Sequence, residues 1–331
     1  MTILLLGGSG YVGQAFQHAM RERGETFVAL SRKQLDYTRY EVLVHFLRSN
    51  HPTFLVNAAG FTGKPNVDAC ETARAETLRG NTLLPLTISH ACDVTETPWG
   101  HVSSGCIYSG AIIDDGQSRR VESDLTKPAI RKLITNRPDV VNGFTEENEP
   151  NFSFQQPPCS FYSGAKALAE ESLIDDPRAY LWRLRIPFNE IDSHRNYLSK
   201  LQRYPKVYDN VNSVSHLDEF VRACLELWQM RAPFGTYNVT NSGFVTSRQV
   251  VELMQSIIKF DREFEFWDDD VAFYELAAKT PRSNCVLDTT KLLAAGVKMR
   301  CVEEALADAF YRWQPEANNC TQQDIRFRKT A

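Results

Sequence analysis

The chain has 331 residues, of which 43% are hydrophobic and 24% are charged, as in an ordinary globular protein with a sizeable core. A formal net charge of -4 gives no reason to expect nucleic acid or an anionic membrane as a partner. No stretch approaches the roughly 20 apolar residues of a membrane span, and the first apolar run is too short for a signal peptide. The 8 cysteines are scattered without CxxC pairs or zinc-ligand spacing, which predicts reduced thiols, no metal and a cytoplasmic protein.

Short apolar runs alternate with amphipathic stretches along the first half of the chain. The apolar runs predict strands, at Ile3–Leu6, Phe27–Leu30, Phe54–Val56, His101–Ser103 and Tyr180–Arg185. The amphipathic stretches predict helices, which span Val12–Met20, Val42–Leu47, Asn81–Cys92 and the residues after Tyr162. Strands that alternate with helices form parallel βαβ units, so we predict an α/β fold with a doubly wound parallel sheet.

The second half of the chain changes to shorter, mixed elements. Helices are predicted there at Val214–Met230, Ser247–Phe260 and Val302–Trp313. We therefore expect a nucleotide-binding domain over residues 1–186 and a smaller substrate lobe over 187–331, which could return strands to the sheet. Residues 110–158 are long, charged and proline-bearing, with at most a short helix near Pro128–Thr135. Such a connection is either a functional lid or a solvated insertion without a role.

Three glycines stand where the first predicted strand ends and the first helix begins. Gly7 permits a tight turn, Gly10 lets the backbone approach a pyrophosphate, and Gly13 allows close packing of helix on strand. The free N–H groups and positive dipole of the helix N-terminus favour phosphate. This strand–glycine–helix context predicts a Rossmann dinucleotide site, to which we also assign the turn residues Ser9, Tyr11 and Val12.

The end of the second predicted strand bears on the choice of cofactor. NAD sites place an acidic residue there for the ribose 2′-hydroxyl, whereas NADP sites need cations for the 2′-phosphate. This chain has Ser31, Arg32 and Lys33 instead. The sequence therefore favours NADP(H), and NAD(H) remains possible if both basic side chains are only solvated.

Tyr162 and Lys166 form Y-x-x-x-K at the start of a predicted helix, one turn apart on the same face. A neighbouring ammonium lowers the pKa of a phenol, so we expect this tyrosine to exchange a proton near neutral pH. The motif alone is common in helices. Downstream of a glycine-rich dinucleotide motif, however, it predicts a redox active site.

With these motifs the chain resembles the short-chain dehydrogenase/reductases of the extended kind over almost all its length. Asn57-Ala58-Ala59-Gly60 is similar to the family's NAAG element, and Asn81 and Ser104 are similar to its helix asparagine and active-site serine. The resemblance implies that Ser104 hydrogen-bonds a substrate carbonyl and that Tyr162 supplies its proton. It further implies that Lys166 holds the nicotinamide ribose, and that the cofactor contacts Asn57, Ala58, Ala59, Gly60 and Asn81.

Within that superfamily the chain is most similar to the plant nucleotide-rhamnose epimerase-reductases, and more distantly to dTDP-4-dehydrorhamnose reductases. The similar blocks lie in both halves: AAGFTGKPNVDACE, SSGCIY, SFYSGAKA, RNYLSKLQRYPKV and PRSNCVLDTTKL. The resemblance implies NADPH-dependent reduction of a nucleoside-diphosphate-4-keto-6-deoxyhexose at C4, with 3,5-epimerisation. Thr62, Asn196 and Arg282 lie in these blocks and are expected to bind the substrate, with Arg282 suited to its phosphate. A surface ion pair is the alternative for Arg282.

Cys106 stands two residues beyond Ser104, so both side chains are expected to leave the same face of the strand end. The related epimerases carry a cysteine here as an acid/base, and Lys200 is similar to its proposed partner. The alternatives are a small buried thiol for Cys106 and a solvated helix lysine for Lys200. His194 is a rival base, although the plant pattern has proline there.

Three other functions remain open on the sequence. A plain 4-reductase or a 4-epimerase with tightly held NAD could use the same triad. A regulatory subunit without catalytic activity could also resemble these enzymes, but it need not keep Ser104, Tyr162 and Lys166 together. We expect a nucleotide-sugar substrate and a homodimer, because extended family members are often dimers.

Overall fold

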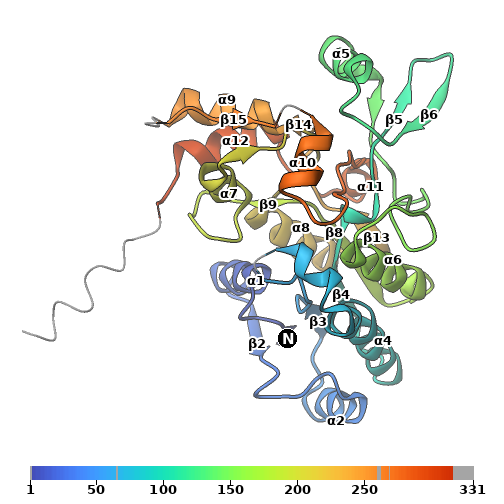
Figure 1. Ribbon diagram of the computed structural model, residues 1–331. Coiled ribbons are helices and arrows are strands. Elements are labelled where there is room, and N and C mark those ends of the chain that lie inside the picture. The colour runs from blue at the N-terminus through green and yellow to red at the C-terminus, as the bar shows by residue number, and fades with distance from the viewer. Residues whose placement is uncertain (1, 65, 259–261, 268, 316–331) are drawn as a thin grey trace, which may run out of the picture.

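The computed structural model describes residues 2–315, apart from residues 65, 259–261 and 268 (Figure 1). Six strands form a parallel sheet in the order β13-β8-β4-β3-β1-β2. Their bounds are β1 (Thr2–Leu6), β2 (Thr26–Leu30), β3 (Phe54–Asn57), β4 (Trp99–Ser104), β8 (Ala179–Leu184) and β13 (Gly235–Asn238). The predicted doubly wound α/β fold is therefore confirmed.

Helices cover both faces of this sheet, and the alternation of side chains along the strands explains why both faces are apolar. In β1, Ile3 and Leu5 belong to the core on one face, while Leu4 and Leu6 belong to the core on the other. The first face is covered by α1 (Tyr11–Glu22) and α8 (Leu217–Gln229). The second is covered by α2 (Tyr40–Asn50), α4 (Leu84–Val94) and α6 (Phe161–Leu173).

The smaller lobe lies beyond the sheet and has its own apolar core (Figure 1). Its helices are α7 (Tyr197–Arg203), α9 (Ser247–Ile257), α10 (Asp270–Leu276) and α12 (Val302–Tyr311), whereas α11 (Thr290–Ala294) places Leu292 in the core of the central sheet. Two-residue strands pair within it: β9 (Pro187–Phe188) with β12 (Ser215–His216), β10 (Lys206–Val207) with β15 (Glu265–Phe266), and β11 (Val211–Asn212) with β14 (Val245–Thr246). One strand of the second half, β13, joins the central sheet instead.

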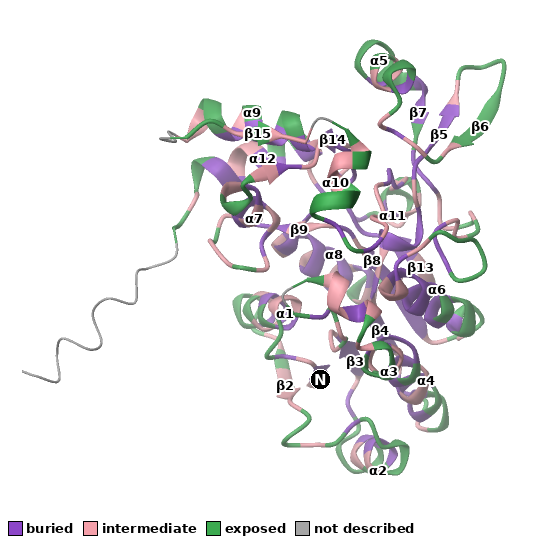
Figure 2. Ribbon diagram, in the orientation of Figure 1, coloured by how far each residue is buried: buried purple, intermediate pink, exposed green. Residues whose placement is uncertain are grey.

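Residues 110–158 contain more structure than the sequence pattern indicates. The short helix is present as α5 (Pro128–Asn136), but three antiparallel strands accompany it: β5 (Ala111–Asp114), β6 (Arg119–Glu122) and β7 (Val141–Asn142). The buried side chains of β5 and α5 pack on Val211 and Val286 of the other lobe. Figure 2 shows buried β5 beside exposed β6. The expectation of a nearly structureless connection was wrong, because many charged residues of this segment lie on the outer strand and in the turns.

Several helix boundaries differ from the prediction; α8, predicted from Val214, begins at Leu217 because Ser215 and His216 form β12. Asn81 lies in a π-helical turn, η2 (Arg79–Leu83), so regular α4 begins only at Leu84. Helix α9 ends at Ile257, and its predicted end, Phe260, lies outside the described residues. Turns of π-helix are rare and are often found at functional sites. None of the described helices combines the length and the apolar character that crossing a membrane requires.

Candidate active site

The glycine-rich turn after β1 has the geometry that a dinucleotide site needs. Gly7 has a φ of +78°, and a Cβ there would stand 2.5 Å from the Ala59 nitrogen. A Cβ on Gly13 would stand 2.2 Å from the Gly7 oxygen, so both positions require glycine. A Cβ on Gly10 would have its nearest heavy atom, the Gly7 oxygen, at 3.4 Å. No side chain caps the N-terminus of α1. The first N–H groups of the helix are therefore left for an anion.

The other residues assigned to this site surround that turn. Ser9 is exposed, Val12 is half-buried, and the Tyr11 hydroxyl donates to Asn189 Oδ1 at 3.3 Å. At the end of β2, the Ser31 hydroxyl donates to Gln34 Oε1 at 2.7 Å. The side chains of Arg32 and Lys33 are exposed and make no ion pair or hydrogen bond with other described residues. Two cations therefore stand free beside the turn, as a 2′-phosphate requires.

The loop after β3 is held by buried amides. Asn57 is fully buried; its Oδ1 accepts from the Ala59 nitrogen at 3.0 Å, and its Nδ2 lies 3.0 Å from His101 Nδ1. The Asn81 amide makes both hydrogen bonds to the Phe61 backbone, at 3.0 Å and 2.7 Å. These contacts hold half-buried Ala58 and Ala59 and exposed Gly60 in place. A Cβ on Gly60 would stand 4.0 Å from Lys166 Nζ, so the loop reaches Lys166.

Ser104 and Cys106 lie at the end of β4, but not in the way that a strand pattern predicts. The strand stops at Ser104, and Cys106 belongs to a short 3-10 turn, η3 (Gly105–Ile107). The Ser104 hydroxyl caps this turn and accepts from the Cys106 nitrogen at 3.3 Å. The expectation of a shared strand face was therefore wrong, because Cys106 lies in the turn beyond the strand, where the cap joins the Ser104 hydroxyl to the Cys106 backbone. The Cys106 thiol is buried.

Tyr162 and Lys166 extend from α6 toward these two residues. Lys166 is 4% exposed and its Nζ donates to the Val102 carbonyl of β4 at 3.1 Å. Burial lowers the pKa of Lys166 to about 8, against the opposing effect of negative charge at Cys106 and at Glu170. The Tyr162 phenol lies close enough to Ser104 and Cys106 for both to affect its pKa. Ser104, Cys106, Tyr162 and Lys166 thus form one cluster at the carboxyl ends of parallel strands.

The sequence led us to expect that Lys166 lowers the pKa of Tyr162, but the pKa of this phenol is raised instead. Burial raises the pKa of the Tyr162 phenol, negative charge at Cys106 raises it further, and the hydrogen bond with Ser104 opposes them. Tyr162 therefore stays protonated at neutral pH. A neutral phenol in hydrogen-bonding contact with a serine is suited to donate a proton to a carbonyl oxygen.

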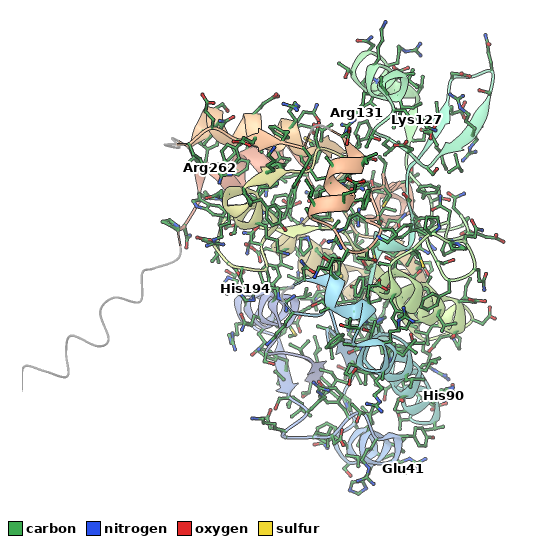
Figure 3. The ribbon with its side chains drawn as sticks, viewed as in Figure 1. Glu41, His90, Lys127, Arg131, His194 and Arg262 are labelled. Carbon is green, nitrogen blue, oxygen red and sulfur yellow. The ribbon has the colours of Figure 1, made fainter. Side chains whose placement is uncertain are left out.

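Lys200 and His194, the two suggested partners of Cys106, lie in α7 and in the loop before it. No hydrogen bond or ion pair joins either of them to Cys106 among the residues that the structure describes. Burial lowers the pKa of Lys200, and the positive charge of nearby Arg195 lowers it further. His194 is exposed to solvent on the loop before α7 (Figure 3). A role for Lys200 in proton exchange stays a prediction.

The three residues that we expect to bind the substrate differ in the contacts that their side chains already make. Thr62 is exposed, and its Oγ1 accepts from Arg195 at 2.9 Å. Asn196 is fully buried and caps α7, and its amide nitrogen donates to the backbone oxygens of Asn189 and Ile191 at 2.7 Å each. Its side chain therefore positions a loop. Arg282 pairs with Asp68 through both nitrogens, at 2.7 Å and 2.8 Å, so it would have to share its guanidinium with a phosphate.

Glu71 is a residue whose role the sequence pattern did not reveal. It ends the 3-10 turn η1 (Val67–Glu71). Its Oε1 accepts from the Phe161 nitrogen at 2.7 Å and from the Thr280 hydroxyl at 2.8 Å. One carboxylate thus joins the first residue of α6, immediately before Tyr162, to the segment that carries Arg282. Glu71 lies in the block AAGFTGKPNVDACE, which pointed to this residue, but the sequence did not indicate which residues it contacts.

Replacing Glu71 with glutamine should lower kcat by roughly 10-fold while leaving the fold intact, because a charge-assisted hydrogen bond contributes about 1.5–3 kcal/mol. The carboxylate also faces the positive end of α6, and an amide does not replace that charge. Steady-state kinetics and thermal unfolding measure the two effects. Glu76→Gln, on an exposed glutamate of the next helix, α3 (Arg74–Leu78), is the matched control. An unchanged kcat in Glu71→Gln would show that the contact does not position Tyr162.

Comparison with protein families identifies the fold family. Residues 1–314 match the family described as the RmlD substrate binding domain. The chain belongs to this family. The match extends over the central sheet and the smaller lobe alike. The resemblance of this RmlD-family chain to plant rhamnose epimerase-reductases and to dTDP-4-dehydrorhamnose reductases is therefore confirmed.

Relatives with named activities align over nearly the whole chain. A protein of Arabidopsis thaliana named bifunctional dTDP-4-dehydrorhamnose 3,5-epimerase/dTDP-4-dehydrorhamnose reductase is 30% identical over 92% of this chain and 91% of its own length. A trifunctional UDP-glucose 4,6-dehydratase/UDP-4-keto-6-deoxy-D-glucose 3,5-epimerase/UDP-4-keto-L-rhamnose-reductase of the same plant is 30% identical over 92% of this chain. The chain spans only 41% of that longer relative.

Solved structures share the fold at lower identity. The crystal structure of the L780 UDP-rhamnose synthase from Acanthamoeba polyphaga mimivirus superposes with a TM-score of 0.79 at 21% identity, over 94% of this chain and 99% of that one. A dTDP-4-dehydrorhamnose reductase from Bacillus anthracis, solved in complex with NADP, superposes with a TM-score of 0.69 at 16% identity, over 93% and 97% of the two chains. At these identities the likeness concerns the fold.

Proposed function

We propose that this RmlD-family chain reduces the C4 ketone of a nucleoside-diphosphate-4-keto-6-deoxyhexose with NADPH and also epimerises C3 and C5 of that sugar. The observation that carries this proposal is the cluster of Ser104, Cys106, Tyr162 and Lys166 beside a glycine-rich dinucleotide turn. The bifunctional Arabidopsis relative, which aligns over 92% of the chain, supports both activities. An intact catalytic cluster speaks against a regulatory subunit without activity.

For the reduction, Tyr162 and Ser104 act on the C4 oxygen. In this proposal Ser104 donates a hydrogen bond to the carbonyl oxygen and Tyr162 gives it a proton, since burial keeps the phenol protonated. Bound NADPH supplies the hydride. Lys166, which reaches Gly60 of the loop after β3, holds the nicotinamide ribose through its ammonium. Both oxygen-binding groups then lie where negative charge develops on the substrate.

For the epimerisation, Ser104 and Tyr162 again bind the C4 oxygen, and Cys106 acts as the base. The protons at C3 and C5 are acidified by the C4 ketone between them, and Ser104 and Tyr162 stabilise the enolate oxygen that forms when either proton leaves. Cys106, held beside Ser104 by the η3 turn, takes one of these protons and the opposite face of the enolate receives another. Lys200 is kept as a candidate for that second proton transfer, because burial lowers the pKa of its ammonium and so makes proton loss easier.

The preference for NADP(H) over NAD(H) rests on Arg32 and Lys33. Arg32→Ala should weaken NADPH binding by roughly 10-fold or more, because a charge-assisted hydrogen bond to phosphate contributes about 1.5–3 kcal/mol. NADH affinity should change little, since NADH has no 2′-phosphate. Fluorescence titration measures both dissociation constants. Arg48→Ala, on an exposed arginine in the last turn of α2, is the control. Equal dissociation constants for NADPH and NADH in the unmutated protein would contradict the preference.

A substrate panel tests the function directly. UDP-, dTDP- and GDP-linked 4-keto-6-deoxyglucose are each incubated with enzyme and NADPH while NADPH absorbance is followed. Oxidation of NADPH with at least one of them, and an L-rhamnose configuration in the product, supports the proposal. Reduction without a change at C3 and C5 would favour a plain 4-reductase. No NADPH oxidation with any of the three sugars would contradict the proposal.

Two finer expectations accompany this function. The seven cysteines within the described residues are all free thiols, which supports a reducing compartment such as the cytoplasm. A homodimer is the expected assembly, and sedimentation equilibrium of the purified chain measures it.

A further inference from the structure

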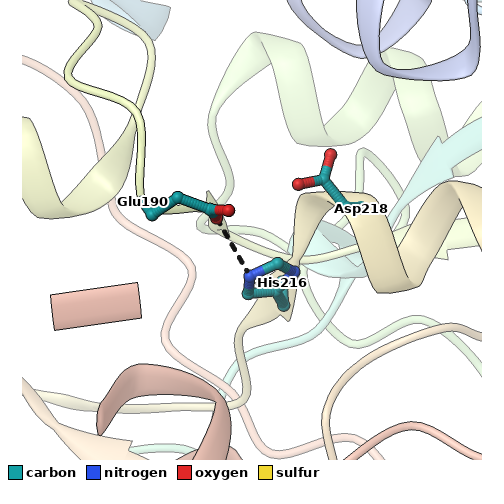
Figure 4. Close-up of side chains that lie close together, drawn as sticks. All are labelled: Glu190, His216 and Asp218. Atoms are coloured by element: carbon teal, nitrogen blue, oxygen red, sulfur yellow. Dashed lines mark ion pairs between the residues drawn. The ribbon is translucent and has the colours of Figure 1, made fainter. Parts of the chain in front are cut away.

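A second group of ionisable side chains lies behind the glycine-rich turn, outside the cluster described above. Glu190 follows β9, His216 ends β12, and Asp218 lies in the first turn of α8. One ligand atom of each side chain lies within 4.8 Å of the others (Figure 4). His216 and Asp218 are two residues apart in the chain, whereas Glu190 comes near them through the pairing of β9 with β12.

The imidazole of His216 is buried without a hydrogen-bond partner. Its side chain is 3% exposed, and neither Nδ1 nor Nε2 makes a hydrogen bond within the described residues. Nε2 lies 3.6 Å from Glu190 Oε2, an oxygen that is also buried without a hydrogen bond. Phe188 packs against the ring at 84° and limits its rotation. His216 and Glu190 thus form a buried ion pair that is too long for a hydrogen bond, and Nδ1 of the same ring has no partner among the described residues. Buried polar groups normally have hydrogen-bond partners, so these atoms leave ligand positions for another group.

The charges around this group leave room for a cation. Arg312 pairs with Glu190, but through the other oxygen, Oε1, at 3.3 Å, and its side chain is half exposed. Asp218 makes no hydrogen bond or ion pair with the residues that the structure describes. Burial raises the pKa of Asp218, and the charge of His216 opposes this shift. The Tyr11 phenol also lies near both carboxylates, which raise its pKa in addition to burial. Among the described residues, Arg312 is the one permanently charged side chain that an ion pair joins to these two carboxylates, and His216 adds positive charge only when it is protonated.

We propose that Glu190, His216 and Asp218 bind one divalent transition-metal ion of the Zn²⁺ type. The ligands are one ring nitrogen and one oxygen of each carboxylate, and water completes a tetrahedral site. Tetrahedral zinc with bonds of about 2.0–2.2 Å places its ligand atoms about 3.4 Å apart, close to the separation of His216 Nε2 and Glu190 Oε2. Mg²⁺ and Ca²⁺ prefer oxygen ligands alone, so the imidazole selects against them.

Bound metal would join the loop after β9 to the start of α8, and both lie beside the Tyr11 side chain of the dinucleotide turn.

The test uses full-length protein that has been treated with EDTA and desalted. It is titrated with Zn²⁺ by calorimetry and with Co²⁺ by visible absorption. We expect one ion per chain, with Co²⁺ bands typical of nitrogen and oxygen ligands. Asp218→Asn and His216→Gln should each weaken Zn²⁺ binding at least about 10-fold. Asp218 is only partly buried, so its variant should fold even if the His216 variant does not.

Two control variants separate this site from surface binding. His18→Gln removes the imidazole of an exposed His18–Glu22 pair that lies near Asp218. His90→Gln removes an imidazole on α4 (Figure 3). Both should bind Zn²⁺ as the unmutated protein does. The proposal is wrong if the unmutated protein binds no stoichiometric Zn²⁺, if Asp218→Asn leaves binding unchanged, or if thiolate charge-transfer bands of Co²⁺ show that cysteines bind the ion instead.

Discussion

Replacing Tyr162 with phenylalanine is expected to lower kcat for ketone reduction by roughly 10²- to 10⁴-fold, the usual loss when a positioned general acid is removed. The ring stays, so the packing of α6 and the affinity for NADPH should change little. Stopped-flow measurement of NADPH absorbance separates the chemical step from cofactor binding. The expected result depends on Tyr162 being protonated in the resting enzyme, which burial and the negative charge at Cys106 favour.

A buried tyrosine elsewhere serves as the matched control. Tyr197 donates to Ser247 Oγ at 3.3 Å in the smaller lobe, and burial raises its pKa to about 12. Tyr197→Phe therefore removes a comparable hydroxyl without touching the cluster of Ser104, Tyr162 and Lys166, and it should leave kcat within about 2-fold. If Tyr162→Phe turned over as fast as Tyr197→Phe, the active site would have to lie elsewhere.

The pH profile gives an independent check on the same cluster. Burial lowers the pKa of Lys166 to about 8, so its ammonium is present below that pH and is lost above it. Because the proposal assigns the ammonium to the nicotinamide ribose, kcat/KM should fall as the pH rises through about 8. This profile is measured at fixed ionic strength. A rate that is flat to pH 10 would contradict the assignment of Lys166.

Cys106→Ser is expected to separate epimerisation from reduction. Serine keeps the size and polarity of the side chain, but a hydroxyl gives up its proton far less readily than a thiol, so the base is lost. The variant should still reduce a sugar whose C3 and C5 configurations already match the product. It should fail to exchange deuterium from solvent into C3 or C5 of the 4-keto-D-sugar, with a loss of roughly 10²-fold or more in the exchange rate.

Deuterium exchange is followed by NMR with NADP⁺ bound, so that no reduction competes. Cys159→Ser is the control, because Cys159 is a partly exposed thiol close enough for its pKa to respond to charge at Cys106. Equal deuterium exchange in Cys106→Ser and the unmutated protein would show that Cys106 is only a packed thiol without a role in proton exchange. No exchange in the unmutated protein would mean reduction without epimerisation.

The sheet and the dinucleotide turn were predictable because their signals are local. Alternation along β1 sends Ile3 and Leu5 to one core and Leu4 and Leu6 to the other, and the glycines at 7, 10 and 13 follow directly. The spacing of Tyr162 and Lys166 on one helix face is likewise local. Such features depend on neighbours in sequence, so composition and periodicity contain them.

What was missed depends on contacts between distant residues. Glu71 meets Phe161 only after the N-terminal domain has folded. Thr280 meets Glu71, and Arg282 meets Asp68, only after the two halves of the chain pack together. The π-helical turn at Asn81 follows from hydrogen bonds to Phe61, which no helix periodicity encodes. The strands within residues 110–158 were hidden because their charged outer residues outweighed the short buried run in β5.

The position of β13 at the edge of the central sheet governs the order in which this chain can fold during synthesis. β13 pairs in register with β8, from Gly235 opposite Tyr180 to Asn238 opposite Arg183. Until the ribosome has released residues 235–238, β8 presents an unpaired edge whose Trp182 lacks its final neighbours. Nascent edges of this kind recruit other chains, so the emerging N-terminal half should depend on a chaperone until β13 arrives.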